Sequence, residues 1–470
     1  MTMSPSDLDA TELAARIAVG ELTAREAVSS SLGRIALLDG QLAALVTVDA
    51  EGAFAAADEA DRLRASAPHS RLPPLLGVPI AVKDLTDTKG LRTTHGSDLC
   101  RDNIPGEDAL SVERMRAAGA IIIGKTNTPE FGFGAVCTNR LCGPTRNPWN
   151  PALTSGGSSG GSAVAVATGM VPIALGTDFG GSVRTPASFC GCLSLRPTPG
   201  RIPEPKRILA RSTLASQGVM ARSTADIELA LQVLAGPERC DPVSHLPAAE
   251  PAPARLRLAV STDLGGAFPV DAAVATAFAE AVDILGRVLG DSEEKAPDVR
   301  GGIEAFKTLR AAESWFNFGS LVETHSDRLT PSFVWNVREG RDISAAEYLA
   351  AEAERSAVYR NFVNFFSDVD LLALPSAPVL PFSNEQEDVL EVGGRKMESI
   401  IDYLACTFLI SLVGFPVLNF PICWTAEDLP FGIQLVARPG QEALLFNAAR
   451  RLEAAGFGHR WPPVSGGRMS

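Results

Sequence analysis

Two glycine–serine clusters contain the residues whose types and spacing could do chemistry. The first is residues 155–162 (SGGSSGGS) and the second is residues 176–182 (GTDFGGS), with an apolar run at 163–175 between them. A flexible Gly/Ser linker would not carry such an apolar run in its middle. Glycine lets backbone N–H groups approach a ligand without a Cβ in the way, and serine supplies a hydroxyl nucleophile that a base must activate. The two clusters therefore favour a catalytic arrangement over a linker.

Lys83 is a candidate base, because it stands at the end of the short apolar run 78–82. An isolated lysine in such a place is most often a surface residue. At a reference pKa of about 10.4, an ordinary lysine is protonated at pH 7 and cannot accept a proton. Burial disfavours the charged form, and we expect it to lower the pKa of Lys83 by about 3 units. Lys83 can therefore act as a base only if the fold buries it.

The elements that must position these residues alternate between strands and helices. From periodicity and capping residues we expect helices at 8–39 with a break at Gly20, and at 51–65, 107–118, 223–235, 270–289, 402–413 and 442–455. We expect strands at 78–82, 120–123, 190–196, 256–260, 371–375, 417–422 and 432–436. Strands that alternate with helices predict an α/β fold with a largely parallel or mixed sheet covered by helices.

Two further segments stand out by composition. Residues 248–254 (AAEPAPA) are the best candidate for a connector. Residues 303–366 are expected to be mostly helical and are rich in aromatic side chains. Packing of helix faces accounts for most such rings. The alternative is that some of them line a substrate funnel in a helical region at about 300–368.

Composition and charge exclude several classes of protein. The chain has 470 residues and a net charge of −13, which disfavours electrostatic binding of nucleic acid. We find neither a secretory leader nor an apolar run of about 18 residues, so we expect no membrane association and a cytoplasmic location. The eight cysteines are scattered without a C-x-x-C pair, and with five histidines they make a zinc site improbable. We therefore expect reduced thiols, no metal and no cofactor.

Residues 119–126 (GAIIIGKT) match the phosphate-binding pattern G-x-x-x-x-G-K-T. In a true phosphate loop the strand comes before the first glycine, and a helix begins at the lysine. Here β-branched residues fill the loop positions, and Asn127 and Pro129 follow where a helix should continue. We therefore reject a nucleotide site.

Three segments together resemble the amidase signature family: residues 77–84 (GVPIAVKD), 156–161 (GGSSGG) and 176–186 (GTDFGGSVRTP). Lys83 and Ser158 are 75 residues apart, and Ser158 and Ser182 are 24 apart, which fits the family. The stretch 414–435 also looks like the family's C-terminal part, so the resemblance covers about residues 8–455. It implies one domain over residues 1–470, with N-terminal helices at 8–65. The implied fold has a mixed, twisted β-sheet core covered by helices on both faces.

The resemblance also implies a Ser–Ser–Lys triad. Ser182 would be the nucleophile, Ser158 the bridging serine with a cis peptide bond, and Lys83 the base. Ser159 is the weaker match for the bridging role. Backbone N–H groups would form the oxyanion hole, and these belong to Phe179, Gly180, Gly181 and Ser182.

The implied triad is chemically sound. Ser158 can accept the proton of Ser182 while it donates its own proton to Lys83, which lets a short side chain reach a distant amine. Glycines free the backbone to direct N–H groups at the oxyanion, and the loss of one such donor typically costs roughly 3 kcal/mol of transition-state stabilisation.

Several charged residues lie near the motifs. Asp178 and Arg184 are expected to form a salt bridge that braces the loop. A carboxylate in contact with Lys83 would raise its pKa, so Asp84 should point away or be held by backbone donors. His95 could belong to a Ser/His/Asp triad as a runner-up mechanism. Pro199 stands where family members often carry an aromatic residue, which affects the expected shape of the pocket.

We therefore expect hydrolysis of an amide C–N bond through an acyl-enzyme. Phe131, Phe133 and the region 315–335 suggest a small to medium apolar or aryl amide, with esters and carbamates as further substrates. The expected partner is then a small-molecule amide substrate, and the sequence leaves open whether the chain forms a homodimer. One alternative is the glutaminase-type A subunit of a tRNA-dependent amidotransferase. Another is a catalytically inactive binding or scaffold protein.

Overall fold

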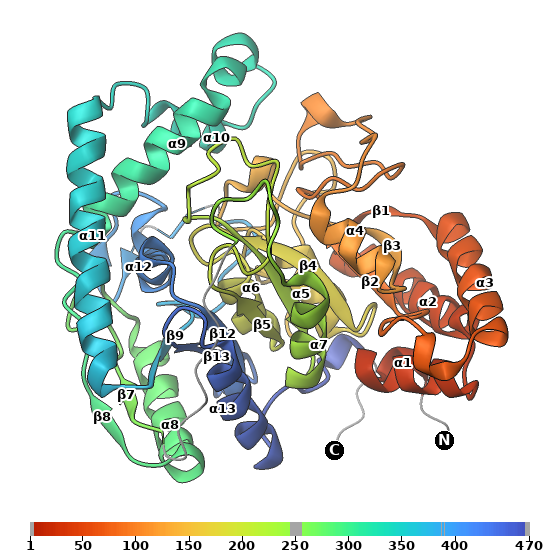
Figure 1. The fold of residues 1–470 in the computed structure, drawn as a ribbon. Coiled ribbons are helices and arrows are strands. Elements are labelled where there is room, and N and C mark those ends of the chain that lie inside the picture. Colours follow the sequence, from red (N-terminus) through yellow and green to blue (C-terminus); the bar gives the residue numbers. More distant parts are fainter. Residues whose placement is uncertain (1–3, 245–255, 387, 390, 466–470) are drawn as a thin grey trace.

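The computed structural model describes residues 4–244, 256–386, 388–389 and 391–465. The predicted connector at 248–254 lies outside the described residues. The core is one mixed sheet, in which eleven strands are described (Figure 1). In spatial order these are β1 (Leu45–Val48), β3 (Ile121–Thr126), β2 (Pro79–Lys83), β4 (Ile173–Asp178), β6 (Ser216–Ala221), β5 (Leu193–Arg196), β12 (Val417–Trp424), β13 (Pro430–Val436), β9 (Leu371–Pro375), β7 (Leu258–Val260) and β8 (Ser292–Glu294).

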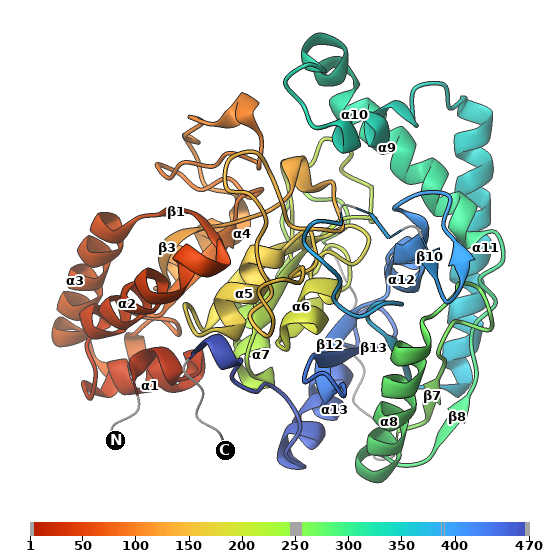
Figure 2. The ribbon, with the colours of Figure 1, turned by 180° about the vertical axis from the view of Figure 1, so that it is seen from behind.

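Helices cover both faces of this sheet (Figures 1 and 2). One face packs against α1 (Ala10–Val19), α4 (Leu110–Ala117), α7 (Thr224–Leu234), α8 (Ala272–Leu289) and α13 (Glu442–Ala454). The other face packs against α2 (Ala24–Leu42), α3 (Ala50–Ser66), α5 (Gly160–Ala167), α6 (Arg184–Cys190), α9 (Gly302–His325), α11 (Ala345–Asp368) and α12 (Ala405–Val413). The prediction of a mixed sheet between two helical layers is thus confirmed.

Strand residues alternate between the two layers. In β4, Ile173 and Leu175 join the first core, whereas Ala174 packs against α5 and its neighbours. Successive side chains of a strand point to opposite faces, so a central strand that is buried on both sides reads as a continuous apolar run. This explains why the run at 163–175 gave no sign of its division into α5, a turn and β4.

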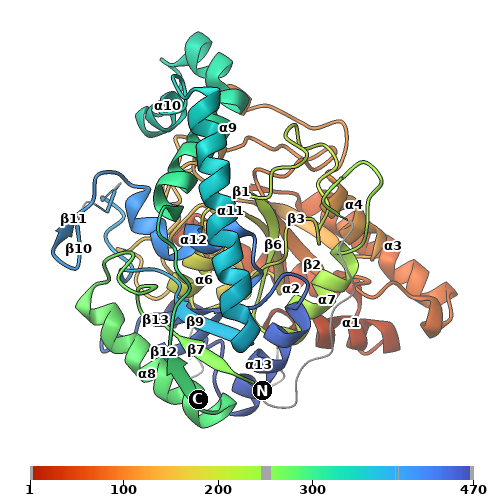
Figure 3. The ribbon, with the colours of Figure 1, turned by 60° about the vertical axis from the view of Figure 1, so that its left-hand side comes forward.

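A helical layer stands over one end of this sheet. The long helices α9 and α11 pack side by side, with α10 (Pro331–Arg338) against α9 (Figure 3). A two-stranded ribbon, β10 (Glu391–Val392) with β11 (Arg395–Lys396), lies apart from the main sheet. The predicted helical region at 303–366 is confirmed as these three helices.

Local chemistry sets several boundaries. Gly20 adopts a left-handed φ of 81° and ends α1, and Thr23 then caps α2 in a reciprocal capping box with Glu26. The strand expected at 190–196 is wrong at its start, because Cys190 ends α6 and β5 begins at Leu193. The helix expected at 107–118 begins only at Leu110.

The ribbon of β10 and β11 was not predicted, and neither were four strands of the main sheet: β1, β4, β6 and β8. The strands β1 and β8 are short edge strands, and β6 contains a glycine and polar residues that weaken a strand pattern.

Among the described residues, no helix has both the length and the apolar character that crossing a membrane requires.

Candidate active site

The parallel pairing of β2 with β4 brings Lys83 to the same edge of the sheet as Thr177 and Asp178. Ile80 pairs with Ile173, and Val82 with Leu175, so Lys83 at the end of β2 lies beside the end of β4. Thr177 and Asp178 are the last residues of β4. Ligand sites in open α/β sheets form outside the carboxyl ends of the strands, and this edge is such a place.

Lys83 is fully buried and surrounded by hydroxyl groups. Its Nζ donates to Ser158 Oγ at 2.7 Å, to Ser159 Oγ at 2.8 Å and to Thr177 Oγ1 at 3.0 Å. Burial lowers the pKa of Lys83 to about 7, against smaller opposing effects of Cys137 and Asp178. A substantial fraction of the amine is therefore uncharged at neutral pH.

Asp84 does not contact the neighbouring lysine. Its carboxylate accepts hydrogen bonds from the backbone N–H of Thr94, at 3.0 and 3.1 Å, and from the Thr94 hydroxyl. The expectation that backbone donors hold this carboxylate away from Lys83 is confirmed. Lys83 thus escapes the charge that would keep it protonated.

The first glycine–serine cluster forms a loop that enters α5. The Gly157–Ser158 peptide bond is cis. Ser159 N–H donates to the carbonyl of Ser182 at 3.0 Å, so the two serine clusters are directly linked. The Ser159 hydroxyl also lies 3.3 Å from the Thr177 carbonyl, to which it can donate its proton. Among the residues that the structure describes, Ser158 has no such carbonyl acceptor, and it lines the cavity with Ser182, which separates the two adjacent serines.

A buried ion pair braces the second cluster. Arg184 Nη2 lies 2.8 Å from Asp178 Oδ1, and both side chains are fully buried. Burial acts to raise the pKa of Asp178, but Arg184 and Arg196 together hold it well below its ordinary value. The carboxylate also accepts the Val183 N–H at 3.1 Å. The predicted role of Asp178 and Arg184 as a loop brace is confirmed.

The backbone of 179–182 differs in one respect from the expected oxyanion hole. Gly181 N–H donates to Asp178 Oδ1 at 2.9 Å and is therefore not available to an oxyanion. In the part of the chain that the structure describes, the N–H groups of Phe179, Gly180 and Ser182 have no acceptor. The structure thus removes Gly181 from the expected donors, because the neighbouring carboxylate occupies it.

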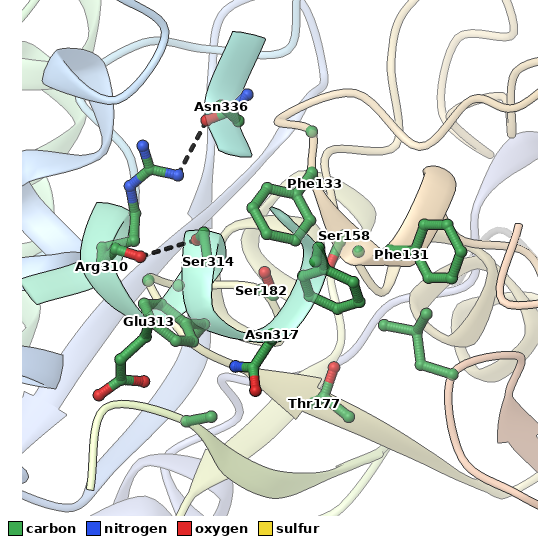
Figure 4. Close-up of a pocket in the computed structure, with 18 of the residues that line it drawn as sticks. Phe131, Phe133, Ser158, Thr177, Ser182, Arg310, Glu313, Ser314, Asn317 and Asn336 are labelled. Atoms are coloured by element: carbon green, nitrogen blue, oxygen red, sulfur yellow. Dashed lines mark hydrogen bonds between the residues drawn. The ribbon is translucent and has the colours of Figure 1, made fainter. Parts of the chain in front are cut away.

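Ser182 opens into a cavity of about 370 Å³ (Figure 4). Five phenylalanines line it, namely Phe131, Phe133, Phe179, Phe306 and Phe318, and the mutual contacts of Phe131 and Phe133 with Phe318 form an aromatic wall. Another part of the lining is polar and comes from α9 and α10, with Arg310, Glu313, Ser314, Asn317 and Asn336. The cavity lined by Ser158 and Ser182 therefore offers both an apolar surface and charged groups.

The family model named Amidase matches residues 26–446 of this chain. The chain belongs to the amidase signature family. It is 34% identical to the A subunit of the glutamyl-tRNA(Gln) amidotransferase of Chromohalobacter salexigens, over 99% of this chain and 100% of the relative. Members of this family cleave amide bonds or transfer the amide nitrogen. Membership therefore supports an enzyme that cleaves a C–N bond.

Solved structures of this amidase family resemble the whole chain. A chain from an inhibitor-bound vestigial protein complex, described as revealing the evolutionary origins of an s-triazine catabolic enzyme, gives a TM-score of 0.87 at 32% identity, covering 96% of this chain and 99% of that one. A bacterial aryl acylamidase gives a TM-score of 0.89 at 25% identity, covering 98% and 99%. Relatives with different described substrates thus share this fold.

Several residues singled out in the sequence of this family member lie away from the cavity. His95 Nε2 is 3.6 Å from Asp87 and does not line the cavity, which leaves the Ser/His/Asp alternative without its base. Pro199 lines a separate cavity, so the expected effect of this residue on pocket shape is wrong. Lys125, from the rejected phosphate pattern, donates to the Thr86 carbonyl and the Thr88 hydroxyl inside the fold.

The predicted funnel region at 300–368 contributes both aromatic and polar residues to the cavity lining. Of its aromatic residues, Phe306 and Phe318 line the cavity, whereas Phe362 and Phe366 pack into the core and Phe316 is exposed. Within the described ranges, no group of three or more His, Cys, Asp or Glu side chains is placed to hold a metal ion.

Sequence reasoning missed several polar residues of the site. Thr177 could have been found, since it directly precedes Asp178 in the second cluster. Arg310 and Asn336 carried no local signal, because their contact joins two helices across 26 residues. Only the packing of α10 on α9 brings them together.

Proposed function

We propose that this chain hydrolyses a carboxamide through an acyl-enzyme on Ser182, with Ser158 as the proton bridge and Lys83 as the base. Ser182 Oγ forms a bond to the amide carbon while its proton passes through Ser158 to Lys83. The relay then protonates the nitrogen as the C–N bond breaks and the amine leaves. Water attacks the acyl-enzyme and releases the acid, which restores all three groups.

The observation that carries this proposal is the short contact of Lys83 with Ser158. A neutral amine has two N–H groups and one lone pair, so one of the three surrounding hydroxyls must donate to it. Ser159 can donate its own proton to the Thr177 carbonyl, which favours Ser158 as a donor to Lys83. Thr177 then supports the amine as an acceptor of one of its N–H groups.

Backbone donors complete the proposed chemistry. The N–H groups of Phe179, Gly180 and Ser182 are the candidates for stabilising the oxyanion. The Thr407 hydroxyl donates to the Gly180 carbonyl at 2.5 Å, which holds this turn in place. Preorganised donors of this kind need no rearrangement when charge develops on the substrate oxygen.

The aromatic wall supports a substrate with an apolar or aryl portion. Phe131 and Phe133 both pack against Phe318 and Phe333, at ring-centroid distances of 5.0–5.7 Å. A fixed cluster of rings of this kind binds flat or aliphatic groups by surface burial. Small to medium amides, with esters and carbamates of similar shape, fit this surface.

The test is covalent labelling of Ser182. A sulfonyl fluoride should modify the wild-type protein at Ser182, as read by peptide mass spectrometry, and should abolish its turnover of a nitrophenyl ester. Ser182→Ala should lose both labelling and turnover. Ser155→Ala, in the other serine cluster, is the matched control and should keep both. Full activity in Ser182→Ala would end the proposal.

A second candidate is the glutaminase-type A subunit of a tRNA-dependent amidotransferase. Full-length similarity to such subunits favours it, including 35% identity over 91% of this chain to the protein of a Roseiflexus species. An A subunit would release ammonia from glutamine and would work with partner chains. Affinity purification from the native host distinguishes the two: further subunits in stoichiometric amounts support the A subunit, whereas a lone chain or homodimer supports the independent hydrolase.

A further inference from the structure

Arg310 is a buried arginine without a carboxylate partner. It is 8% exposed and lies on α9, where it lines the same cavity as Ser182 (Figure 4). Its guanidinium makes one hydrogen bond within the described residues, from Nη1 to Asn336 Oδ1 at 2.9 Å. Its Nε is buried without any partner. Arginine is rarely buried in this way, because an unpaired charge away from water is costly.

The other charged groups of the cavity already have partners. Arg207 forms an ion pair with Glu204. Glu313 accepts a hydrogen bond from Ser212 Oγ at 2.8 Å, and its pKa is raised by burial. Neither Glu313 nor the nearby Glu339 forms an ion pair with Arg310 in the described part of the chain. Arg310 is thus the positively charged residue of this lining that has no ion-pair partner in the described part of the chain.

Asn336 fixes the position of the guanidinium. Its Nδ2 donates to the Ser332 carbonyl at 2.9 Å within α10, which orients its Oδ1 toward Arg310. The arginine is therefore held at one nitrogen, while Nη2 has no partner among the described residues. A planar guanidinium with free N–H groups matches the two oxygens of a carboxylate.

We propose that Arg310, positioned by Asn336, binds a carboxylate on the substrate, and that the enzyme therefore acts on amides that carry an acidic group away from the scissile bond. This inference rests on the proposed hydrolysis at Ser182. The aliphatic or aryl segment between the two ends would lie along the aromatic wall. Monoamides of dicarboxylic acids are the simplest members of this class.

The experiment compares matched pairs of amides that differ only in the carboxylate. The pairs are succinamate with butanamide, glutaramate with pentanamide, and adipamate with hexanamide. Glutamine is added to test the effect of an ammonium group. We expect kcat/KM to favour the best acidic amide over its neutral partner by about 100-fold, mainly through KM, as for a desolvated charge pair.

Two variants assign that preference. Arg310→Met should reduce it to less than about fivefold, whereas Arg338→Met, an exposed arginine on α10, should leave it intact. Binding is measured separately with glutarate in the Ser182→Ala background, where glutarate should raise the melting temperature. That shift should disappear when Arg310→Met is added.

The outcomes separate this inference from the proposed function. If neutral and acidic amides react equally well and Ser182→Ala still abolishes both, the acidic-substrate inference is wrong and the hydrolase stands. If Ser182 is neither labelled nor needed for turnover, the proposed function fails, and the glutarate shift still tests the anion site. A purely structural Arg310 would show a lower melting temperature in Arg310→Met with the preference unchanged, which overturns the inference. If Arg310→Met does not fold, Arg310→Gln, which also removes the charge, and Asn336→Ala, which removes the partner that positions it, are compared in the same way.

Discussion

Lys83 Nζ lies 2.7 Å from Ser158 Oγ, and within the described residues no Asp or Glu side chain forms an ion pair with it. The nearest acidic residue along the chain, Asp84, is held by Thr94. Asp178 is neutralised by two arginines. The fold thus binds both neighbouring carboxylates to other partners and keeps them out of ion pairs with the amine, which is the condition for a lysine to act as a base.

The pH dependence of activity should report the protonation of Lys83. Its pKa of about 7 means that the active, neutral amine is lost as pH falls below that value. We expect kcat/KM to fall about tenfold per pH unit below pH 6 and to reach a plateau above pH 8. Lys83→Met should lose most activity, and its residual activity should no longer fall between about pH 8 and pH 6. Lys89 is an exposed lysine, so Lys89→Met should keep the activity and the pH dependence of the wild type. A wild-type profile that rises only near the ordinary lysine pKa would contradict a neutral Lys83.

The two serines in contact with Lys83 should differ in their effect on catalysis. Ser158→Ala removes the proposed proton bridge, so kcat should fall by about 10³-fold or more, within the range of general-base effects. Ser159→Ala removes only a support whose own proton can go to the Thr177 carbonyl, and we expect a loss of about tenfold. Steady-state kinetics on a nitrophenyl ester measure both. Equal losses in the two variants would remove the distinction between them.

Asp178 should stabilise the fold far more than an exposed ion pair does. Asp178→Asn leaves Arg184 and Arg196 buried without a counter-charge, which should cost about 3–5 kcal/mol of unfolding free energy. Asp58→Asn breaks the exposed pair with Arg25 and should cost less than about 1 kcal/mol. Urea denaturation near pH 7 provides both values. A small effect of Asp178→Asn would show that the brace is not needed for stability.

Gly181 should tolerate no side chain. It has a φ of +123°, and a Cβ there would overlap the Thr407 hydroxyl. Gly266 also has a positive φ, of +84°, but faces open space, so Gly266→Ala isolates the backbone strain of about 1–2 kcal/mol. Gly181→Ala should cost at least ~1 kcal/mol more, because of overpacking, and should reduce activity. Comparable melting temperatures and full activity in both variants would contradict the close packing of this turn.

The strands and helices with strong local patterns were predictable. The strand at 371–375 has the bounds that its apolar run indicates, and α2 begins where Thr23 and Glu26 form a capping box. The phosphate-loop match at 119–126 could be rejected because β-branched residues favour a strand, and β3 confirms this. By contrast, β6 pairs with β4 and β5 although its own sequence has little strand character, so its neighbours decide its conformation.

By itself, the sequence determined which residues are candidates for the chemistry, since glycine and serine spacing and the lysine at the end of an apolar run are local properties. The tertiary structure alone decided their states. The pKa of Lys83 falls to about 7 because the fold removes water from it, the Gly181 N–H is taken up by Asp178, and Arg310 lines the cavity without an ion-pair partner in the described part of the chain. These outcomes depend on burial and on contacts between distant segments, and such interactions have no counterpart in the local pattern of residues.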